Sequence, residues 1–335
     1  MKLLITGGCG FVGHHFVEHF LKTTDWEIVI FDKLSYASSG FDRLRDIDCF
    51  DNSRVKIFPI DLTLPISDGV KREVGQVDYL INLASASHVD NSIEDPVPFI
   101  QNNINLMLYL LEWCRTLQIK KFIHFSTDEV YGTAPKHINY CEGDRTNPGN
   151  PYSASKAAQE SICRAYANTY GLPIIITNTM NVIGERQHPE KFVPLVIRKV
   201  TEGETVQVHA DETRCNAGTR FYIHARNVAD AIHFLLSNET ESLDNIDASK
   251  GQYNIVGERE IDNLLLAQTI AEIIGNPLQY EMCDFHSSRP GHDLRYALDG
   301  EKIKKAGWES PKGFEESLQK TVNWTIKNDR WYLKS

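Results

Sequence analysis

A short apolar segment at the start of the chain, Lys2–Thr6, runs directly into the glycine-rich sequence T-G-G-C-G-F-V-G. The spacing G-x-x-G-x-x-G places Gly7, Gly10 and Gly13 at the junction between a predicted strand and the helical pattern Phe11–Lys22. Glycines suit such a junction because the backbone must turn tightly and let a phosphate group approach the helix N-terminus. A tight turn alone would also account for the glycines, but a preceding strand and a following helix are the context that dinucleotide binding requires.

The first half of the chain alternates short apolar segments with longer helical patterns. Further strand candidates are Glu27–Phe31, Val55–Pro59, Tyr79–Leu83, Lys121–Phe125 and Ile174–Thr177. Several are continuously apolar, as expected for strands buried on both faces of a parallel sheet. Helical patterns cover Val97–Leu117 and Pro151–Tyr170, and the second stops at Gly171. The alternation predicts an α/β fold, with a doubly wound parallel sheet of the Rossmann type over residues 1–180.

The alternation becomes less regular after about residue 180. Segments rich in His, Pro, Gly and charged residues separate shorter helices, of which Asn263–Ile274 and Phe314–Ile326 have the clearest patterns. We therefore expect residues 181–335 to form mainly a smaller C-terminal substrate-binding lobe, with some segments returning to the first domain.

Composition excludes several classes of protein. The net charge of −10 argues against a nucleic-acid-binding surface, which needs a basic stripe. No stretch approaches the ~20 apolar residues that span a membrane, and the apolar run at the N-terminus is too short for a signal peptide. The seven cysteines are scattered without a C-x-x-C pair, so neither a disulfide framework nor a metal site is expected. The sequence predicts a soluble, cytoplasmic protein.

An acidic residue ends the second predicted strand. Asp32 lies 19 residues after Gly13. A carboxylate at this strand end accepts hydrogen bonds from the two hydroxyls of an adenosine ribose, and it repels a 2′-phosphate. The sequence therefore predicts NAD rather than NADP as the cofactor, the alternative being that Asp32 is a solvated loop acid.

Tyr152 and Lys156 stand four residues apart in N-P-Y-S-A-S-K, so their side chains share one face of the predicted helix. A phenol with a pKa of about 10 is a poor base at neutral pH. A nearby ammonium, together with the positive nicotinamide of an oxidised cofactor, lowers that pKa by favouring the phenolate. The spacing Y-x-x-x-K occurs by chance in many helices. Following a dinucleotide motif and a strand that ends in Ser126-Thr127, it predicts a catalytic pair.

Together these motifs resemble the extended short-chain dehydrogenase/reductase superfamily. Within it, the chain is similar to the nucleotide-sugar 4,6-dehydratases that act on dTDP-glucose or UDP-glucose, over essentially its whole length. The resemblance is carried by F-D-K-L-S-Y-A (31–37), S-H-V-D-N-S-I (87–93), S-T-D-E-V-Y-G (126–132), N-P-Y-S-A-S-K (150–156), H-P-E-K-F-V-P (188–194) and R-P-G-H-D-L-R-Y-A-L-D (289–299). The last block and T-D-E are more specific than the glycine motif.

The resemblance implies a role for each residue of a catalytic set. Tyr152 would take the proton of the sugar 4-hydroxyl while C4 gives hydride to NAD, Lys156 would hold the nicotinamide ribose, and Thr127 would hydrogen-bond the C4 oxygen. Glu129 would remove the C5 proton, and Asp128 would protonate the departing C6 hydroxyl. Return of the hydride to C6 would give a 4-keto-6-deoxy sugar and regenerate NAD.

The division of labour between Asp128 and Glu129 also has a physical basis. Elimination of water needs one group that accepts a proton and another that donates one. Two adjacent carboxyl groups can divide these roles if their environments separate their pKa values. The hypothesis is that Asp128 is protonated when substrate is bound.

The resemblance also implies two sets of binding residues. The cofactor would contact Gly7, Gly10, Phe11, Val12, Gly13, Asp32, Lys33, Ser35, Asp61, Leu62, Leu83, Ala84, Asn102, Tyr152 and Lys156. The nucleotide sugar would contact Ser87, His88, Asn181, Lys191, Arg220, Asn254, Arg289, His292 and Tyr296. Arg220 and Arg289 match pyrophosphate-binding arginines, which suits the fit of a planar guanidinium to phosphate oxygens. The alternative for His88 is a core histidine, and for the arginines a solvated charge.

Related activities differ at the acid pair. Nucleotide-sugar 4-epimerases keep the Thr or Ser, Tyr and Lys but have small residues in place of the acids. UDP-glucuronate decarboxylases keep the glutamate without the aspartate, and GDP-mannose 4,6-dehydratases also lack this aspartate and generally prefer NADP. Asp128 therefore favours a glucose-type dehydratase over these relatives, and the complete catalytic set disfavours an inactive NAD-binding scaffold.

Departures from the family pattern concentrate in the predicted lobe. Val182 replaces a second asparagine, R-F-Y-I-H-A-R-N occupies 220–227, and the stretch Ala210–Thr219 is about four residues longer than usual. The sequence therefore supports the predicted catalysis better than it identifies the base of the nucleotide. Members usually form homodimers through two helices per subunit, which match Val97–Leu117 and Pro151–Tyr170; the alternative is that both helices simply cover their own sheet.

Overall fold

Seven parallel strands form the central sheet of the computed structural model, which describes residues 1–244, 246–284 and 294–333. The order across the sheet is β10-β6-β5-β4-β1-β2-β3. The strands are β1 (Lys2–Thr6), β2 (Glu27–Asp32), β3 (Val55–Pro59), β4 (Tyr79–Asn82), β5 (Lys121–Thr127), β6 (Ile174–Thr179) and β10 (Gln252–Ile255). The chain reverses its direction of winding between β1 and β4, and this is where a doubly wound sheet opens a crevice for a ligand. The predicted α/β fold with a doubly wound parallel sheet is confirmed.

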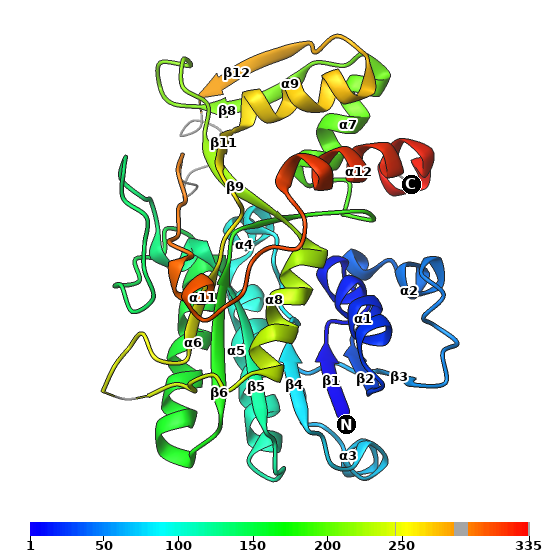
Figure 1. Cartoon of the computed structure of the whole chain (residues 1–335), viewed down its shortest axis with the longest axis vertical. Coiled ribbons are helices and arrows are strands. Elements are labelled where there is room, and N and C mark those ends of the chain that lie inside the picture. The colour runs from blue at the N-terminus through cyan, green and yellow to red at the C-terminus, as the bar shows by residue number, and fades with distance from the viewer. Residues whose placement is uncertain (245, 285–293, 334–335) are drawn as a thin grey trace.

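Helices cover both faces of the sheet (Figure 1). One face carries α1 (Phe11–Thr23) and α8 (Ala225–Ser237), and the other carries α3 (Asp68–Val74), α5 (Pro96–Cys114) and α6 (Pro151–Tyr170). Successive strand residues point to opposite faces, so Leu3 and Ile5 join the core under α1 whereas Leu4 joins the core under α5. Burial on both sides is the physical reason why β1 reads as a continuous apolar run.

A smaller lobe lies beyond the carboxyl ends of the strands (Figure 1). It contains the three-stranded sheet β11-β9-β7, the parallel pair β12-β8 and three helices. The elements are β7 (Asn181–Ile183), β8 (Val206–Ala210), β9 (Thr219–His224), β11 (Glu260–Asp262), β12 (Tyr280–Asp284), α7 (Phe192–Glu202), α9 (Asn263–Ile274) and α12 (Phe314–Lys327). The lobe has a core of its own, built around Val196, Ile197, Leu266 and Leu318.

Some later segments lie with the large sheet rather than with the lobe. α8 packs against α1, β10 pairs with β6, and the short helix α11 (Glu301–Lys305) lies beside β10. Two short helices follow strands of the large sheet: α2 (Asp42–Asp46) comes after β2 and contacts α1, and α4 (Val89–Glu94) comes after β4 and contacts α5 and α6. Among the helices that the structure describes, none has the length and apolar character needed to cross a membrane.

Candidate active site

A cavity of about 370 Å³ opens at the carboxyl ends of the strands. All five predicted catalytic residues line it, as do all fifteen predicted cofactor positions. Residues at or just after the ends of β1, β2, β4, β5 and β6, together with the start of α6, therefore converge on one space, although they are spread over nearly the first two hundred positions of the chain.

The glycine turn between β1 and α1 has the geometry that its sequence predicts. Gly7 has a φ of 71°, a conformation that favours glycine, and Gly10 N donates a hydrogen bond of 3.0 Å to Gly7 O. A Cβ atom on Gly13 would lie 2.1 Å from Gly7 O, so only glycine allows the helix to approach the turn this closely. The N-cap of α1, Gly10, offers no side-chain cap, which leaves backbone N–H groups directed at the cavity for a pyrophosphate.

Asp32 lies at the end of β2 and is held in a fixed position. Its Oδ2 accepts a hydrogen bond from Cys9 N at 3.0 Å, and its Oδ1 accepts one from Leu34 N at 2.8 Å. Burial raises the pKa of this carboxyl, and the two backbone N–H groups oppose that shift. Lys33 Nζ donates to Asn102 Oδ1 at 2.6 Å, which joins this wall of the cavity to α5.

Replacing Asp32 by Asn is expected to narrow the preference for NAD over NADP by about tenfold, because the variant keeps the size of the side chain but loses the charge that repels a 2′-phosphate. Dissociation constants for both cofactors, measured by titration calorimetry on cofactor-stripped protein, would test this expectation. An unchanged ratio of the two constants would show that Asp32 does not distinguish the 2′-hydroxyl of NAD from the 2′-phosphate of NADP.

The T-D-E segment bends away from the sheet at the end of β5. Thr127 is the last residue of the strand, and Asp128–Tyr131 form a short 3₁₀ helix. Thr127 Oγ1 donates to Asp128 Oδ1 at 2.9 Å and accepts a hydrogen bond from Glu129 N at 3.3 Å, so one hydroxyl orders both acids. Thr127 also hydrogen-bonds the Tyr152 side chain, which places the phenol beside the acid pair.

The two acids occupy different environments. Asp128 is buried, with a relative exposure of 5%, and burial followed by the charge of Glu129 raises its pKa to about 7. Among the described residues, no group hydrogen-bonds its second oxygen, Oδ2. Glu129 is only partly buried, and its Oε2 accepts a hydrogen bond of 3.2 Å from Asn150 Nδ2. The first acid is thus suited to hold a proton near neutral pH, whereas the second opens to the cavity.

Tyr152 and Lys156 lie in the first two turns of α6, which begins at Pro151 behind the N-cap Asn150. Lys156 Nζ donates to Phe125 O at 2.7 Å, and burial lowers its pKa to about 8. Burial raises the pKa of Tyr152, and the charge of Glu129 raises it further. Among the side chains, the hydrogen bond with Thr127 opposes this rise in the Tyr152 pKa, while the Lys156 ammonium is bonded to β5. The predicted lowering by the ammonium together with the positive nicotinamide stays a prediction.

A buried polar network under the T-D-E segment was not predicted from the sequence. Glu160, one turn after Lys156 on α6, accepts hydrogen bonds from Ser126 Oγ at 2.5 Å and from Asn178 Nδ2 at 2.7 Å. Asn178 Nδ2 also donates to Thr127 O at 3.1 Å. The network ties the end of β5 to β6 and α6, and its only signal in the sequence was an acid placed four residues after the lysine.

Only some of the predicted substrate residues line the cavity. Ser87, Asn181 and Lys191 line the cavity. His88 lies next to Ser87, with its Nε2 3.4 Å from Glu190 Oε2, and Arg220 lies over the ring of buried Tyr296 at 4.5 Å.

The structure does not bring Asn254 to the cavity. Its side chain is fully buried in β10, and its Nδ2 donates to Tyr140 O and Asp299 O at 3.0 Å each, whereas its Oδ1 has no hydrogen-bond partner among the described residues. The contact of Asn254 with substrate therefore stays a prediction. Arg289 and His292 lie outside the described residues.

The fold and the cavity define an NAD-binding member of the short-chain dehydrogenase type, and comparisons with known proteins agree. A model of the NAD dependent epimerase/dehydratase family matches residues 3–255. A dTDP-glucose 4,6-dehydratase of Escherichia coli is 35% identical over 355 residues, which cover 99% of this chain and 94% of that protein. The structure of a dTDP-glucose 4,6-dehydratase from Streptomyces venezuelae, with NAD and TYD bound, is 32% identical, with a TM-score of 0.85 and 99% of each chain covered.

A plant relative is longer. The trifunctional UDP-glucose 4,6-dehydratase/UDP-4-keto-6-deoxy-D-glucose 3,5-epimerase/UDP-4-keto-L-rhamnose-reductase of Arabidopsis thaliana is 33% identical over 340 residues, and this chain spans about half (48%) of its length. The chain belongs to the NAD dependent epimerase/dehydratase family, and its cofactor is NAD.

Proposed function

We propose that this protein is an NAD-dependent nucleotide-sugar 4,6-dehydratase, which converts dTDP-glucose or UDP-glucose to the 4-keto-6-deoxy sugar nucleotide. The observation that carries the proposal is the pair of unlike acids at the end of β5. Asp128 is buried with a pKa of about 7, while its neighbour Glu129 is partly exposed to the same cavity. Loss of water across C5 and C6 needs one such donor and one such acceptor.

Bound NAD would supply the group that accepts hydride from C4 and later returns it to C6. The side chains around it divide the proton transfers. Tyr152, hydrogen-bonded to Thr127, would take the proton of the 4-hydroxyl, and Thr127 would hold the same oxygen. Burial opposes formation of the phenolate, so this step depends on a positive charge near the ring. Lys156, fixed by Phe125 O, would hold the nicotinamide ribose beside it.

The acid pair would then act on the ketone. A 4-ketone acidifies the C5 hydrogen, which Glu129 would remove from a position fixed by the amide of Asn150. Asp128 would give its proton to the departing 6-hydroxyl through Oδ2, which has no hydrogen-bond partner among the described residues. An epimerase has no need of either transfer, so the acid pair favours dehydration over 4-epimerisation. The same pair disfavours an inactive scaffold.

Turnover of nucleotide sugars tests the proposal. Purified protein would be incubated with dTDP-glucose, UDP-glucose and UDP-N-acetylglucosamine, and kcat/KM for formation of a 4-keto product would be compared. We expect turnover of at least one of the two glucose nucleotides. The base methyl distinguishes them by only about 1–3 kcal/mol, so the assay rather than the sequence identifies the base. Formation of a 4-epimer without a 4-keto-6-deoxy product would contradict the proposal.

We also propose that the protein is a homodimer assembled through α5 and α6. These helices lie side by side, and they leave Val97, Ile100, Tyr109 and Tyr170 exposed, by 36–61% of their surfaces. Apolar side chains exposed along two adjacent helices are suited to pack against a second copy. A monomeric mass by light scattering would contradict this assembly.

A cytoplasmic location stays a prediction from the sequence.

A further inference from the structure

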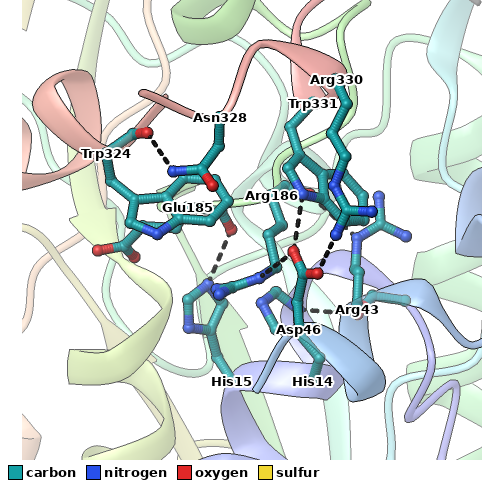
Figure 2. Close-up of polar contacts among 11 residues, drawn as sticks. His14, His15, Arg43, Asp46, Glu185, Arg186, Trp324, Asn328, Arg330 and Trp331 are labelled. Carbon is teal, nitrogen blue, oxygen red and sulfur yellow. Dashed lines mark hydrogen bonds and ion pairs between the residues drawn. The ribbon is translucent and has the colours of Figure 1, made fainter. Parts of the chain in front are cut away.

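A cluster of polar and aromatic side chains joins three segments that are far apart in the sequence (Figure 2). The segments are the cofactor loop and α2 (33–46), the loop after β7 (184–191) and the C-terminal turn (328–331). The residues that link them are Arg43, Asp46, Arg186, Arg330 and Trp331, which we call the clasp. None of the five lines the cavity, and none has a role in the proposed reaction.

Arg43 connects the cofactor loop to the loop after β7. Its side chain is almost completely buried, with a relative exposure of 1%. Its guanidinium donates to Ala37 O at 2.8 Å, to Ser38 O at 2.6 Å and to Arg186 O at 3.0 Å. A buried cation needs such acceptors, and here the acceptors are main-chain carbonyls of the two loops. Each bond therefore fixes the backbone of a segment rather than a single side chain.

Asp46 connects the same helix to the C-terminal turn. Its Oδ2 accepts hydrogen bonds from Trp331 Nε1 at 2.9 Å and from Arg186 Nε at 3.3 Å, while its Oδ1 is paired with Arg330. Figure 2 shows the carboxylate between these donors. The indole of Trp331 also lies against Arg43, with the guanidinium carbon 5.2 Å from the ring centre. The C-terminal turn thus contacts both Arg43 and Asp46 of the α2 helix.

The loop after β7 has a second anchor. His15, on α1, lies with its Nε2 3.2 Å from Glu185 O, and the Glu185 carboxylate pairs with His224 Nε2 at 2.9 Å. Arg186 has a φ of 65° and lies over Trp324 of α12, with its guanidinium carbon 4.4 Å from the ring centre. The loop is therefore held by α1 on one side and by the clasp on the other.

The clasp reaches both walls of the cofactor cavity through the residues next to it. Ala37 and Ser38, whose carbonyls bind Arg43, line the cavity beside Asp32. Gln187, which follows Arg186 in the chain, lines a second wall together with Lys191. Movement of the C-terminal turn away from α2 would therefore release constraints on both walls.

We propose that Arg43 and Asp46 are positioning residues through which the C-terminal turn holds the two walls of the cavity together and slows the release of NAD. The inference rests on the assignment of this cavity to NAD, but not on the reaction that follows. Release of NAD is measured without substrate, so a failure of the dehydratase proposal and a failure of this one give different results.

Asp46→Asn is the direct test. Asn keeps the shape of the side chain, but it removes the negative charge and turns an N–H group toward donors that need an acceptor. We expect NAD to leave this variant about tenfold faster than it leaves the unchanged protein. The release rate is measured by rapid dilution of the NAD-bound protein into excess labelled NAD. With NAD saturating, kcat should stay within about twofold, so that the effect falls on cofactor affinity rather than on the chemical step.

Asp42→Asn is the matched control. It makes the same change of charge on the same helix, but Asp42 pairs only at 3.5 Å with Arg45, and both side chains are more than half exposed. We expect unchanged NAD release in this variant. Equal release rates in Asp46→Asn and the unchanged protein would overturn the proposal, as would an equal acceleration in Asp42→Asn.

Trp331→Phe provides a second test if Asp46→Asn folds poorly. Phenylalanine keeps an aromatic ring near Arg43 but cannot donate the Nε1 hydrogen bond to Asp46. NAD release should lie between the rates of the unchanged protein and Asp46→Asn. A lower unfolding temperature with unchanged release would assign the clasp to stability alone and refute its role in retaining the cofactor.

Discussion

Glu129→Gln is expected to abolish exchange of the C5 hydrogen with solvent while leaving oxidation at C4 largely intact. Glutamine keeps the length of the side chain and can still accept the hydrogen bond that Asn150 gives to Glu129. It cannot accept a proton, however, and loss of a positioned general base typically lowers a rate by about 10²–10⁴-fold. Oxidation should survive because Thr127, Tyr152 and Lys156 are unchanged.

The measurement is incubation of dTDP-glucose or UDP-glucose in deuterated water, with the C5 position followed by NMR. Formation of reduced nicotinamide in the same sample reports oxidation at C4 and serves as the internal control. Continued exchange at C5 in the variant would remove Glu129 from the role of base.

Asp128→Asn is expected to have the reciprocal effect. Asparagine fills the same buried space and can still accept the hydrogen bond of Thr127, but it has no proton to give to a leaving hydroxyl. Water loss should therefore fall by about 10²–10⁴-fold, while exchange at C5 continues. Full rates of both oxidation and water loss in this variant would show that the assignment of Asp128 is wrong.

The pH dependence of the unchanged protein offers an independent view of Asp128. Its pKa of about 7 belongs to a group that acts in the protonated form, so kcat/KM for water loss should fall as the pH rises through about 7. In Asp128→Asn this fall should disappear, leaving only a later one from Lys156, whose pKa is about 8. Identical profiles in the two proteins would assign the fall to another group.

The regular parts of the domain could be predicted from the sequence. Helix α6 begins at Pro151 and ends before Gly171, which adopts a left-handed conformation with a φ of 69°, so the start and stop signals alone define it. Helix α5 is shorter than predicted because the apolar pattern continues to Leu117, which packs against the core from the loop after Cys114. The apolar pattern after Cys114 therefore indicates burial and not helical structure.

The end of β5 shows where prediction from local sequence stops. The apolar run ends at Phe125, but the strand continues because Ser126 and Thr127 pair with Asn178 and Thr179 of β6. These polar residues gain their backbone partners from a strand fifty residues away. Thr127 therefore lies in the sheet and not in a loop, which fixes its position more firmly than its sequence suggested.

The polar contacts behind the site could not be predicted either, because their partners also lie far apart in the sequence. Motifs identified the residues that line the cavity, because the chemistry restricts their types and spacing. Glu160 and the clasp act through partners on other elements, and single residues such as Asp46 or Trp331 have no local pattern that marks them. Asn254 was predicted to contact the substrate, but nothing in the sequence indicated that its amide also binds two backbone carbonyls.

Transfer of a label within the substrate tests the central claim most directly. Glucose nucleotide carrying deuterium at C4 would be converted by the purified protein with its NAD, and the product analysed by NMR. The proposed function predicts a 4-ketone with the deuterium at C6, because the hydride taken from C4 returns to the carbon that lost its hydroxyl. A product that keeps deuterium at C4 with an inverted hydroxyl would instead show an epimerase, and would contradict the roles given to Asp128 and Glu129.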